Sequence, residues 1–404
     1  MTYRERQPLT VLSDNNFFKT KKEIDWLDVH TNGRPKDTAT NLALLLQDLN
    51  FQVVFNEMMR DMEIIMPNKQ FISSIENDQK MAFIVSACNE HNLSTKNLDK
   101  YLSLLASPYH PVKDWIESKD WDGKDRISLL MSALGSISDT SKELFYKHSL
   151  YSVACLYKEN ISADGFICFV GKQGLGKTQF VKSLAPSEYV YISAQLNPED
   201  KDKVHQCCRS WLCELGEVDK TTRHADISAL KAFITKPIDE YRLPYHKEPQ
   251  NFPRRTAFFG TVNNKDFLRD KTGNRRFWII EPTELNWEHD IDMQQYWAQI
   301  KKDFDKGESW HLDDKTIVSI NQQNDKYTRK SDIEERLEEF LEGNSKLISF
   351  NWNAHYSYTE VLGWLNLEKA SQLEKQDLIN YMDARYGERK SYGGKKSWHV
   401  IKEA

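Results

Sequence analysis

Residues 171–178 read GKQGLGKT, and the apolar run GFICFV (165–170) precedes them. The stretch fits the pattern G-x-x-x-x-G-K-[S/T], in which glycines let backbone N–H groups approach a phosphate closely. These glycines are Gly171, Gly174 and Gly176. The run before the motif is typical of a buried strand and TQFVKSLA after it of a helix, which is the context the motif requires. A chance glycine turn is the alternative, and the complete match in this context favours a phosphate loop.

A phosphate loop predicts a nucleotide and its metal ion. Lys177 would reach the β- and γ-phosphates of ATP, and the hydroxyl of Thr178 would bind Mg²⁺. The helix that follows would direct its positive N-terminal end at the same phosphates. ATP and Mg²⁺ are therefore the expected cofactors.

Two acidic residues lie at the end of a second apolar strand. The segment RSWLCELGEVD (209–219) places Glu214 and Glu217 there. An ATPase needs one carboxylate near magnesium and one group that activates or positions the attacking water. Glu214 is the choice for the metal and Glu217 for the water, although the two roles can be exchanged. The alternative is that both are solvated loop residues.

A third apolar strand, RTAFFGTVNN (255–264), ends in Thr261, Asn263 and Asn264. A polar side chain there could orient the attacking water, and an ordinary asparagine turn explains the pattern nearly as well. Arg275 and Arg276 then precede the apolar run FWII. An arginine can stabilise transition-state charge on the γ-phosphate, often from a neighbouring subunit. The alternative is a solvated charge pair.

The sequence between these strands predicts a basic hairpin. The segments YRLPY (241–245) and RRTAFF (254–259) would flank a tip that holds His246 and Lys247, with Arg242 close by. A basic hairpin that points into a ring channel could follow the backbone of single-stranded DNA. A surface hairpin with incidental charge is the alternative.

Composition limits the class of protein. The chain has 404 residues, 39% of them hydrophobic and 28% charged, which predicts two or three soluble domains. No apolar run approaches the roughly 20 residues of a membrane helix, and the start lacks an apolar signal-peptide centre, so a cytosolic protein is expected. The net charge of −5 argues against an overall basic coat and allows local basic surfaces. The six cysteines have neither CxxC nor zinc-finger spacing, which favours reduced, buried thiols.

We expect a multidomain α/β protein with three parts. Residues 1–110 are predicted to form a mainly helical domain, in which Asp37 or Thr38 caps a helix through TATNLALLLQDL and FQVVFNEMM forms a strand. Residues 111–310 would form the phosphate-loop domain, since short β-rich runs alternate there with helices, as in a parallel sheet. Residues 331–404 show helices followed by strand, Gly-Gly turn and strand, which fits a winged-helix domain.

The last of these strands and the helix before them carry a cluster of basic residues with interleaved aromatics. Phosphate contacts use lysine and arginine, whereas bases stack on aromatic rings. We therefore expect the C-terminal part to contact DNA, which could be duplex DNA. The alternative is a basic turn that is merely solvated. The basic residues are Arg385, Arg389, Lys390, Lys395 and Lys396, and the aromatic residues are Tyr386, Tyr392 and Trp398.

Taken in order, these segments resemble the virulence-associated protein E family. The resemblance covers residues from about 110 to 285. Its segments are WIESKDWDGKDRISLLMSALG, GKQGLGKT, WLCELGEVD, ALKAFITKPIDEYRLPY, GTVNNKDFL and TGNRRFW. The family is encoded by phages and pathogenicity islands and is related to superfamily three helicases, so the resemblance implies an AAA+-like ATPase core.

The resemblance also implies residue roles. Asn263 matches the sensor asparagine and Arg275 or Arg276 the arginine finger. The stretch from Lys231 through Asp239 and Arg242 matches the segment before a DNA-contacting hairpin. The family pattern does not fix the hairpin tip. Some relatives carry a primase domain upstream, whereas the first 110 residues here lack an acidic primase constellation. They are expected to serve as a collar, a loader contact or a DNA-binding unit.

The expected function is a magnesium- and ATP-dependent DNA motor, a helicase or replication initiator of a phage-like mobile element in the bacterial cytosol. An arginine supplied by a neighbour implies a ring of subunits, and the family implies six. One alternative is a DNA-binding regulator or replication-interference protein that uses ATP only as a switch. Another alternative is a small-molecule kinase. The RRFW segment and the lack of an evident acceptor motif argue against it.

Overall fold

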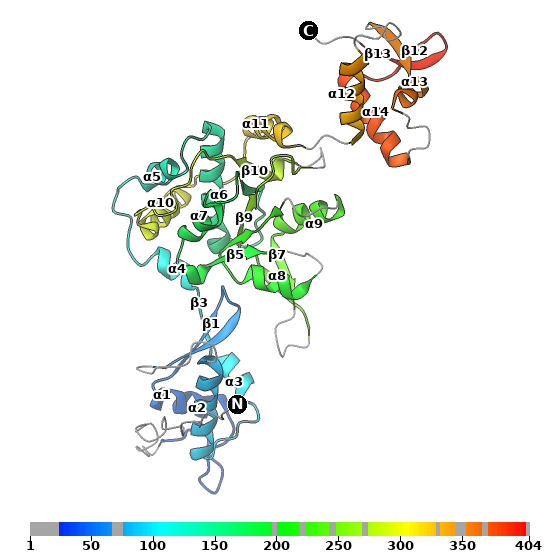
Figure 1. Ribbon diagram of the computed structural model, residues 1–404. Helices are drawn as coiled ribbons and strands as arrows, with labels where there is room; N and C mark the ends of the chain where they lie inside the picture. Colours follow the sequence, from blue (N-terminus) through cyan, green and yellow to red (C-terminus); the bar gives the residue numbers. More distant parts are fainter. Residues whose placement is uncertain are drawn as a thin grey trace, which may run out of the picture. The chain divides into compact units, whose positions relative to one another are not determined.

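The computed structural model describes residues 24–66, 76–195, 200–218, 224–241, 248–268, 274–328, 332–344, 353–365 and 371–400 (Figure 1). Two compact units divide the chain. The first runs to Asp120 and includes Arg209–Trp211, and the second consists of Trp121–Cys208 and Leu212–Ala404. Among the described residues, none of the helices is both long enough and apolar enough to span a membrane.

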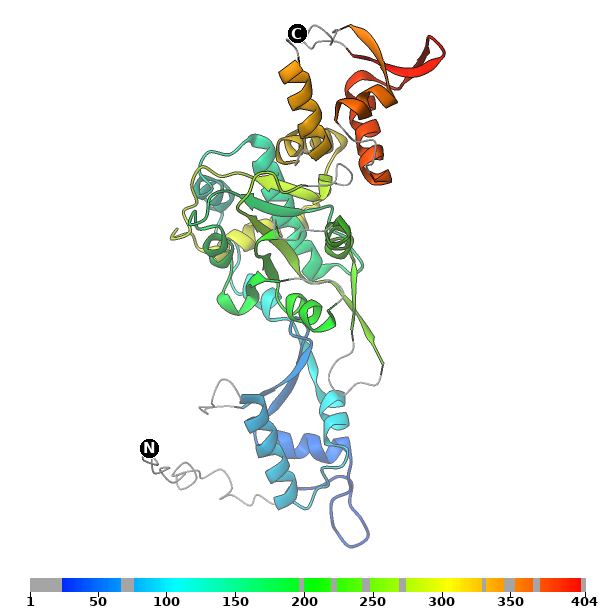
Figure 2. The ribbon, with the colours of Figure 1, turned by 45° about the vertical axis from the view of Figure 1, so that its right-hand side comes forward.

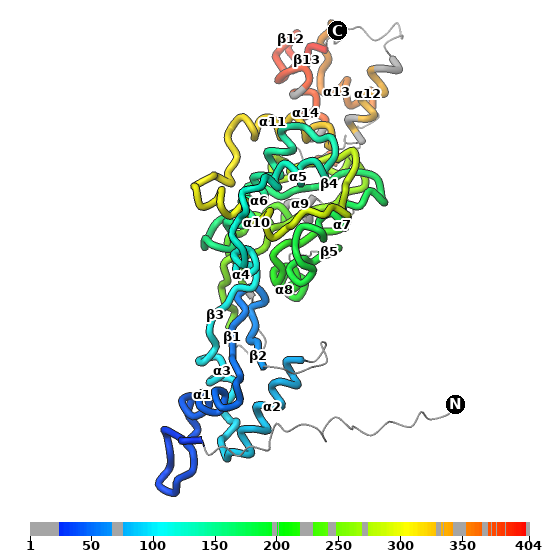
Figure 3. Tube along the Cα trace, turned by 90° about the vertical axis from the view of Figure 1, so that its left-hand side faces the viewer, coloured from blue at the N-terminus to red at the C-terminus, as the bar shows by residue number. Residues whose placement is uncertain are grey.

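The first unit combines helices with a small sheet. Strands β1 and β2 form an antiparallel hairpin, and β3 lies parallel to β1 on its other side, so the order is β2-β1-β3 (Figure 3). Thr38 caps the first helix, because its hydroxyl accepts a hydrogen bond from the N–H of Asn41. The expected helices are present, and the sheet extends beyond the one strand expected. The elements are α1 (Ala39–Asp48), β1 (Gln52–Asn56), β2 (Asp61–Ile65), α2 (Glu76–Glu90), α3 (Leu98–Leu105), β3 (Ser107–Tyr109) and α4 (Pro111–Ile116).

The second unit is built on a five-stranded parallel sheet with the order β10-β4-β9-β6-β5. The three central strands are β4, β9 and β6, and every residue of each is buried, as in a sheet covered on both faces. This explains why their sequences are continuous apolar runs rather than alternating ones. The strands are β4 (Phe166–Val170), β5 (Val190–Ala194), β6 (Leu212–Leu215), β9 (Ala257–Val262) and β10 (Phe277–Ile280).

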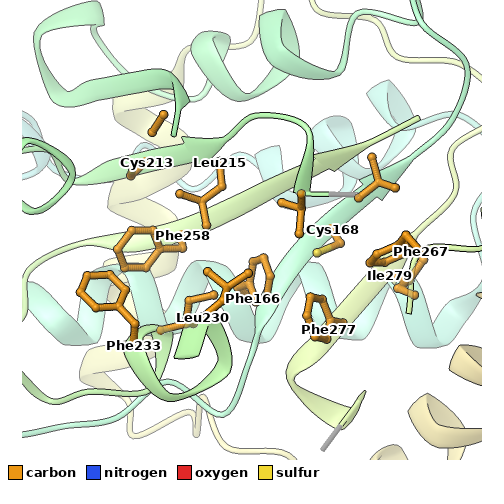
Figure 4. Close-up of a cluster of buried hydrophobic side chains, with 14 of the residues drawn as sticks. Phe166, Cys168, Cys213, Leu215, Leu230, Phe233, Phe258, Phe267, Phe277 and Ile279 are labelled. Carbon is orange, nitrogen blue, oxygen red and sulfur yellow. The ribbon is translucent and has the colours of Figure 1, made fainter. Parts of the chain in front are cut away.

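Helices cover both faces of this sheet. On one face, the ring of Phe169 in β4 contacts Phe145 of α6 and Phe180 of α7. On the other face, Phe258 of β9 packs against Phe233 of α9 (Figure 4). The helices of this unit are α5 (Arg126–Ala133), α6 (Asp139–Tyr157), α7 (Lys177–Ser183), α8 (Lys201–Cys208), α9 (His224–Ile234), α10 (Met293–Asp305) and α11 (Asp314–Asn324), with the short 3₁₀ turns Ser187–Tyr189, Asn274–Arg276 and Asp325–Tyr327.

The strand order determines which chain segments meet. Because all five strands are parallel, the carboxyl ends of β4, β9 and β6 lie at one edge of the sheet. Strand β9 comes later in the chain yet inserts between β4 and β6. The three loops that leave these neighbouring ends are the phosphate loop, the loop after Val262 and the loop after Leu215. Ligands of parallel α/β sheets bind at this edge.

The hairpin differs from the sequence expectation. Strand β7 (Ile238–Tyr241) pairs with β8 (Gln250–Pro253), and the two run side by side (Figure 2). The hairpin therefore uses IDEY and QNFP, not YRLPY and RRTAFF. The expectation for RRTAFF was wrong because its apolar residues 257–259 belong to β9, where the central sheet buries them completely.

Arg254 connects this hairpin to the rest of the unit. Its Nε donates a hydrogen bond of 2.9 Å to Asp239 Oδ1, and its Nη2 contacts the same oxygen. Its Nη1 donates to the carbonyl oxygen of Phe233 at 2.7 Å, and its guanidinium lies 4.3 Å from the centre of that residue's ring. Both charged side chains are almost fully buried. The pair thus joins β7 to α9 directly before β9 begins.

The C-terminal segment of the second unit has the order helix, strand, helix, helix, strand, strand. Its antiparallel sheet has the order β11-β13-β12, and Gly393 and Gly394 take positive φ in the turn between β12 and β13. The longest helix of this segment ends at Tyr386, and Gly387 follows it with φ +80°. The elements are α12 (Asp332–Asn344), β11 (Ala354–Ser357), α13 (Tyr358–Trp364), α14 (Gln372–Tyr386), β12 (Lys390–Tyr392) and β13 (Lys395–Val400).

All six cysteines are buried and unpaired, as their spacing predicted. In the described parts of the chain, no group of three or more His, Cys, Asp or Glu side chains is arranged to hold a metal ion. The cysteines therefore serve as small core residues.

A buried histidine makes the stability of the second unit depend on pH. His148 of α6 is fully buried, its Nε2 lies 2.8 Å from the carbonyl oxygen of Phe258, and burial lowers its pKa from 6.5 to about 4. The unfolded chain takes up this proton below pH 6.5 and the folded chain does not. Stability present above pH 6.5 is therefore lost as the pH falls toward 4, by about 3 kcal/mol in total.

This prediction is checked by urea unfolding of the wild type and a His148→Gln variant at several pH values between 4 and 7.5. Glutamine can still donate to the carbonyl group but does not titrate. As the pH falls, the unfolding free energy of the wild type should decrease relative to that of the variant. A difference that stays constant over this range would contradict the prediction.

Candidate nucleotide-binding site

The loop between β4 and α7 has the backbone that its glycines predicted. Gly174 and Gly176 have φ of +87° and +90°, in the left-handed region that favours glycine. Gly171 is needed for a different reason, since a Cβ there would lie 2.7 Å from Cδ2 of Leu175. The N–H of Gly171 donates to the carbonyl oxygen of Val262 at 3.2 Å, which ties the loop to β9.

Lys177 lies at the centre of the site. Its side chain is largely buried, and Nζ donates to the carbonyl oxygens of Gly171 at 2.6 Å and Lys172 at 3.0 Å. Nζ also donates to Oδ1 of Asn263 at 3.0 Å. The lysine therefore connects the phosphate loop to the residue that directly follows β9. A cation held among backbone groups of a phosphate loop is well placed to contact a polyphosphate.

Glu214 is fully buried at the end of β6 and accepts hydrogen bonds from three directions. Its Oε1 accepts from the hydroxyl of Thr178 at 3.2 Å and from the hydroxyl of Thr261 at 2.5 Å. Its Oε2 accepts from the backbone N–H of Ser193 at 2.5 Å. These bonds satisfy both carboxylate oxygens and fix the side chain against the first turn of α7.

The residues present fit a magnesium ion that also binds phosphate. The Thr178 hydroxyl and the Glu214 carboxylate are oxygen ligands within hydrogen-bond distance of each other. Magnesium in proteins is usually held by one or two such groups together with waters and substrate phosphates, not by an all-protein cage.

Glu217 and Asn263 lie at the same edge of the sheet. Glu217 follows β6 by two residues, is exposed and has φ +54°, which is uncommon for a residue with a side chain. Asn263 follows β9 directly and contacts Lys177. The Oδ1 of Asn264 accepts a hydrogen bond from the N–H of Asp266 at 3.2 Å. The structure thus brings together Lys177, Thr178, Glu214 and Asn263.

The two arginines lie at the opposite edge of the sheet. Arg275 is exposed and Arg276 half-buried in the turn before β10, and Phe277 of that strand pairs with Phe166 at the start of β4. The phosphate loop begins five residues further along β4, about 17 Å away at 3.3 Å per residue. An arginine side chain does not span that distance, so these residues cannot complete the site of their own chain. Lys231 holds their turn, since its Nζ donates to Oδ1 of Asn274 at 3.2 Å.

The residues that the sequence assigned to the hairpin or to the segment before it fall into two groups. Arg242, His246 and Lys247 lie outside the described residues. Asp239 is described, and its burial with Arg254 makes it part of the hairpin's base, not of its surface.

The C-terminal basic residues are not equivalent. Lys390, Lys395 and Lys396 are exposed, as is Tyr392 of β12. Arg389 is half-buried, with its guanidinium 5.0 Å from the ring centre of Trp398. The role expected for Trp398 in stacking was wrong: its side chain is 1% exposed and its Nε1 donates to Asp383.

Arg385 is also partly committed within this segment, since its Nη1 donates to the hydroxyl of Tyr381 and its guanidinium lies near the ring of Tyr386. Of the residues predicted to contact DNA in this segment, the three lysines and Tyr392 are therefore the exposed ones.

Sequence reasoning missed two parts of the site. Thr261 was noted as a polar strand end, but its bond to Glu214 follows from the insertion of β9 beside β6. Ser193 contributes a backbone N–H at φ +55°, and a backbone group carries no signal of residue type.

Comparison with known proteins gives one family match and several similar solved structures. A family model described as virulence-associated protein E-like domain matches residues 116–329. No curated protein matches the sequence. Two apo structures of the NrS-1 C-terminal region (305–718) each align at 16% identity and a TM-score of 0.49, covering 89% of this chain and 99% or 98% of the other. A further A-form structure of that region aligns at 17% identity and a TM-score of 0.47, with 89% and 98% covered.

Proposed function

The chain belongs to the virulence-associated protein E-like family, and from this we propose that it is an ATP-hydrolysing motor or initiator that acts on DNA during replication of a phage-like mobile element. It would act in the bacterial cytosol. The observation that carries the ATPase proposal is the meeting of a loop lysine, a loop threonine and a buried glutamate at one sheet edge.

Each residue of the site has a proposed task. The glycines of the loop expose backbone N–H groups to the phosphates, and Lys177 contacts the β- and γ-phosphates. Thr178 and Glu214 hold Mg²⁺, which when bound neutralises charge on the phosphates. Asn263 and Glu217 orient the attacking water, and Glu217 is the base. The contact between Lys177 and Asn263 supports a shared position at the γ-phosphate.

The arginines support an assembly of subunits. Arg275 and Arg276 lie about five strand residues from their own phosphate loop, so one of them would act on the nucleotide of a neighbour. A head-to-tail interface of this kind closes into a ring, and we propose a hexamer. The strand order, with the sensor strand between the phosphate-loop strand and the acidic strand, supports an AAA+-like core.

Two features support DNA as the partner. The C-terminal order of helix, strand, helix, helix, strand and strand is that of a winged helix, and its exposed lysines with Tyr392 would contact duplex DNA. The β7–β8 hairpin, fixed at its base by Arg254, would reach single-stranded DNA in the ring channel.

ATP hydrolysis measured with magnesium, with and without single-stranded DNA, tests the proposal. We expect DNA to raise the rate several-fold and the protein to displace a strand from a forked duplex. A hydrolysis rate that does not change with DNA, together with no strand displacement, would reject the motor and favour a switch that binds DNA. Hydrolysis that rises only with a small-molecule phosphate acceptor would favour a kinase.

A further inference from the structure

An exposed tryptophan lies against the phosphate loop. A Cβ at Gly176 would lie 2.5 Å from Cδ1 and 3.0 Å from Nε1 of Trp287. The indole therefore occupies the space beside the last glycine before Lys177, and yet 41% of Trp287 is exposed. Scattered exposed apolar residues are normal on protein surfaces. What distinguishes Trp287 is its contact with the loop that the proposed function assigns to phosphate.

The segment that carries Trp287 is fixed on both sides. It leaves the carboxyl end of β10, which neighbours β4, and so emerges at the edge of the sheet where the loop lies. Before the tryptophan, the N–H of Asn286 donates to the carbonyl oxygen of Ala133 at 2.9 Å. After it, Nε2 of His289 lies 3.1 Å from Oγ of Ser183 in α7. The second contact ties the segment to the helix that the loop begins.

This geometry fits a flat ligand attached to the phosphates. A nucleotide held by the loop must place its sugar and base beyond the α-phosphate. A partly exposed indole beside the loop offers a stacking surface there. The strength of aromatic stacking depends little on which base is bound, because every base has a π-face. Such stacking contributes appreciably to the free energy of binding. A larger purine ring covers more of the indole than a pyrimidine does.

We propose that Trp287 stacks on the base of the bound nucleotide and favours a purine nucleoside triphosphate over a bare polyphosphate. This inference rests on the proposed nucleotide site and adds the residue that recognises the nucleoside. Trp287 is a binding residue in this account, and it takes no part in the transfer of the phosphoryl group.

The test compares two ligands that share the phosphates and differ in the base. Binding of ATP and of inorganic tripolyphosphate, each with magnesium, is measured by titration calorimetry on the full chain. The variants are Trp287→Ala, Trp287→Phe and Trp121→Ala, the last a half-buried tryptophan whose Nε1 donates to the carbonyl oxygen of Lys124. Trp287→Ala should weaken ATP binding about 5- to 100-fold and leave tripolyphosphate unchanged. Trp287→Phe should retain most of the affinity, and Trp121→Ala all of it.

The outcomes separate the inference from the proposed function. Equal weakening of both ligands by Trp287→Ala would overturn the inference in favour of a structural role, and so would no weakening of either. Wild-type protein that binds both ligands equally well would also overturn it while leaving the phosphate site intact. Wild-type protein that binds neither ligand would reject the proposed function itself, and the inference with it.

Discussion

Lys177→Ala is expected to lower ATP hydrolysis at least about a hundredfold, the usual effect of removing a group that stabilises transition-state charge. Lys177 supplies the cation at the centre of the site, between two loop carbonyl oxygens and Asn263. Its loss removes the contact that the β- and γ-phosphates would make. Steady-state phosphate release with magnesium and saturating ATP measures the effect.

Two further variants make this result specific. Lys182→Ala removes an exposed lysine from the same helix, α7, and should retain full activity. Lys177→Arg keeps the charge but replaces a compact ammonium with a wider fork, so hydrolysis should fall while the fold is retained. Thermal unfolding of each variant separates lost chemistry from lost structure. Full hydrolysis by a folded Lys177→Ala protein would exclude this loop as the ATPase site.

Asp239→Ala is expected to destabilise the second unit by about 3–5 kcal/mol, because it leaves the Arg254 guanidinium buried without its partner. Both side chains are almost completely excluded from solvent. Urea unfolding followed by circular dichroism measures the shift in the transition of this unit.

A surface ion pair of the same unit provides the matched control. Asp305 accepts from Lys301 one turn earlier on α10, and its side chain is 49% exposed. Asp305→Ala should therefore change the unfolding free energy by only about 0.5 kcal/mol. The double variant Asp239→Leu with Arg254→Met should recover much of the loss, since an apolar pair leaves no buried charge. Equal effects of Asp239→Ala and Asp305→Ala would show that the buried pair is not needed.

The parts of the site predicted from sequence are those whose signals are local. The glycine spacing, the strand before Gly171 and the helix after it lie within 20 residues, and the structure has them as expected. The polar residues Glu214 and Asn263 could be found because each follows an apolar run directly. In a parallel sheet, such strand ends meet at one edge whatever the strand order.

The errors arise where pairing is decided by distant residues. The segment RRTAFF was expected to form one side of the hairpin. Instead, Arg254 is buried against Asp239, and Nη1 of Arg255 donates to the carbonyl oxygens of Cys155 and Leu156 at the end of α6. Neither partner can be read from the local pattern. Trp398 was misjudged for a similar reason, since α14 covers its face of a short sheet.

Trp287 gave no signal in the sequence, because it lies more than 100 residues after the loop that it contacts. Its place depends on β10 lying next to β4, a neighbour relation that the chain order does not reveal.

The sheet keeps Arg275 and Arg276 at one edge and Lys177 at the other. For a site completed by a neighbour's arginine, a solitary subunit could hold a nucleotide without consuming it. The hydrolysis rate per subunit would then rise with protein concentration. Dilution alone would abolish hydrolysis, although each subunit stays folded. ATP would then be hydrolysed only where several copies of the protein assemble, for example on the same stretch of DNA.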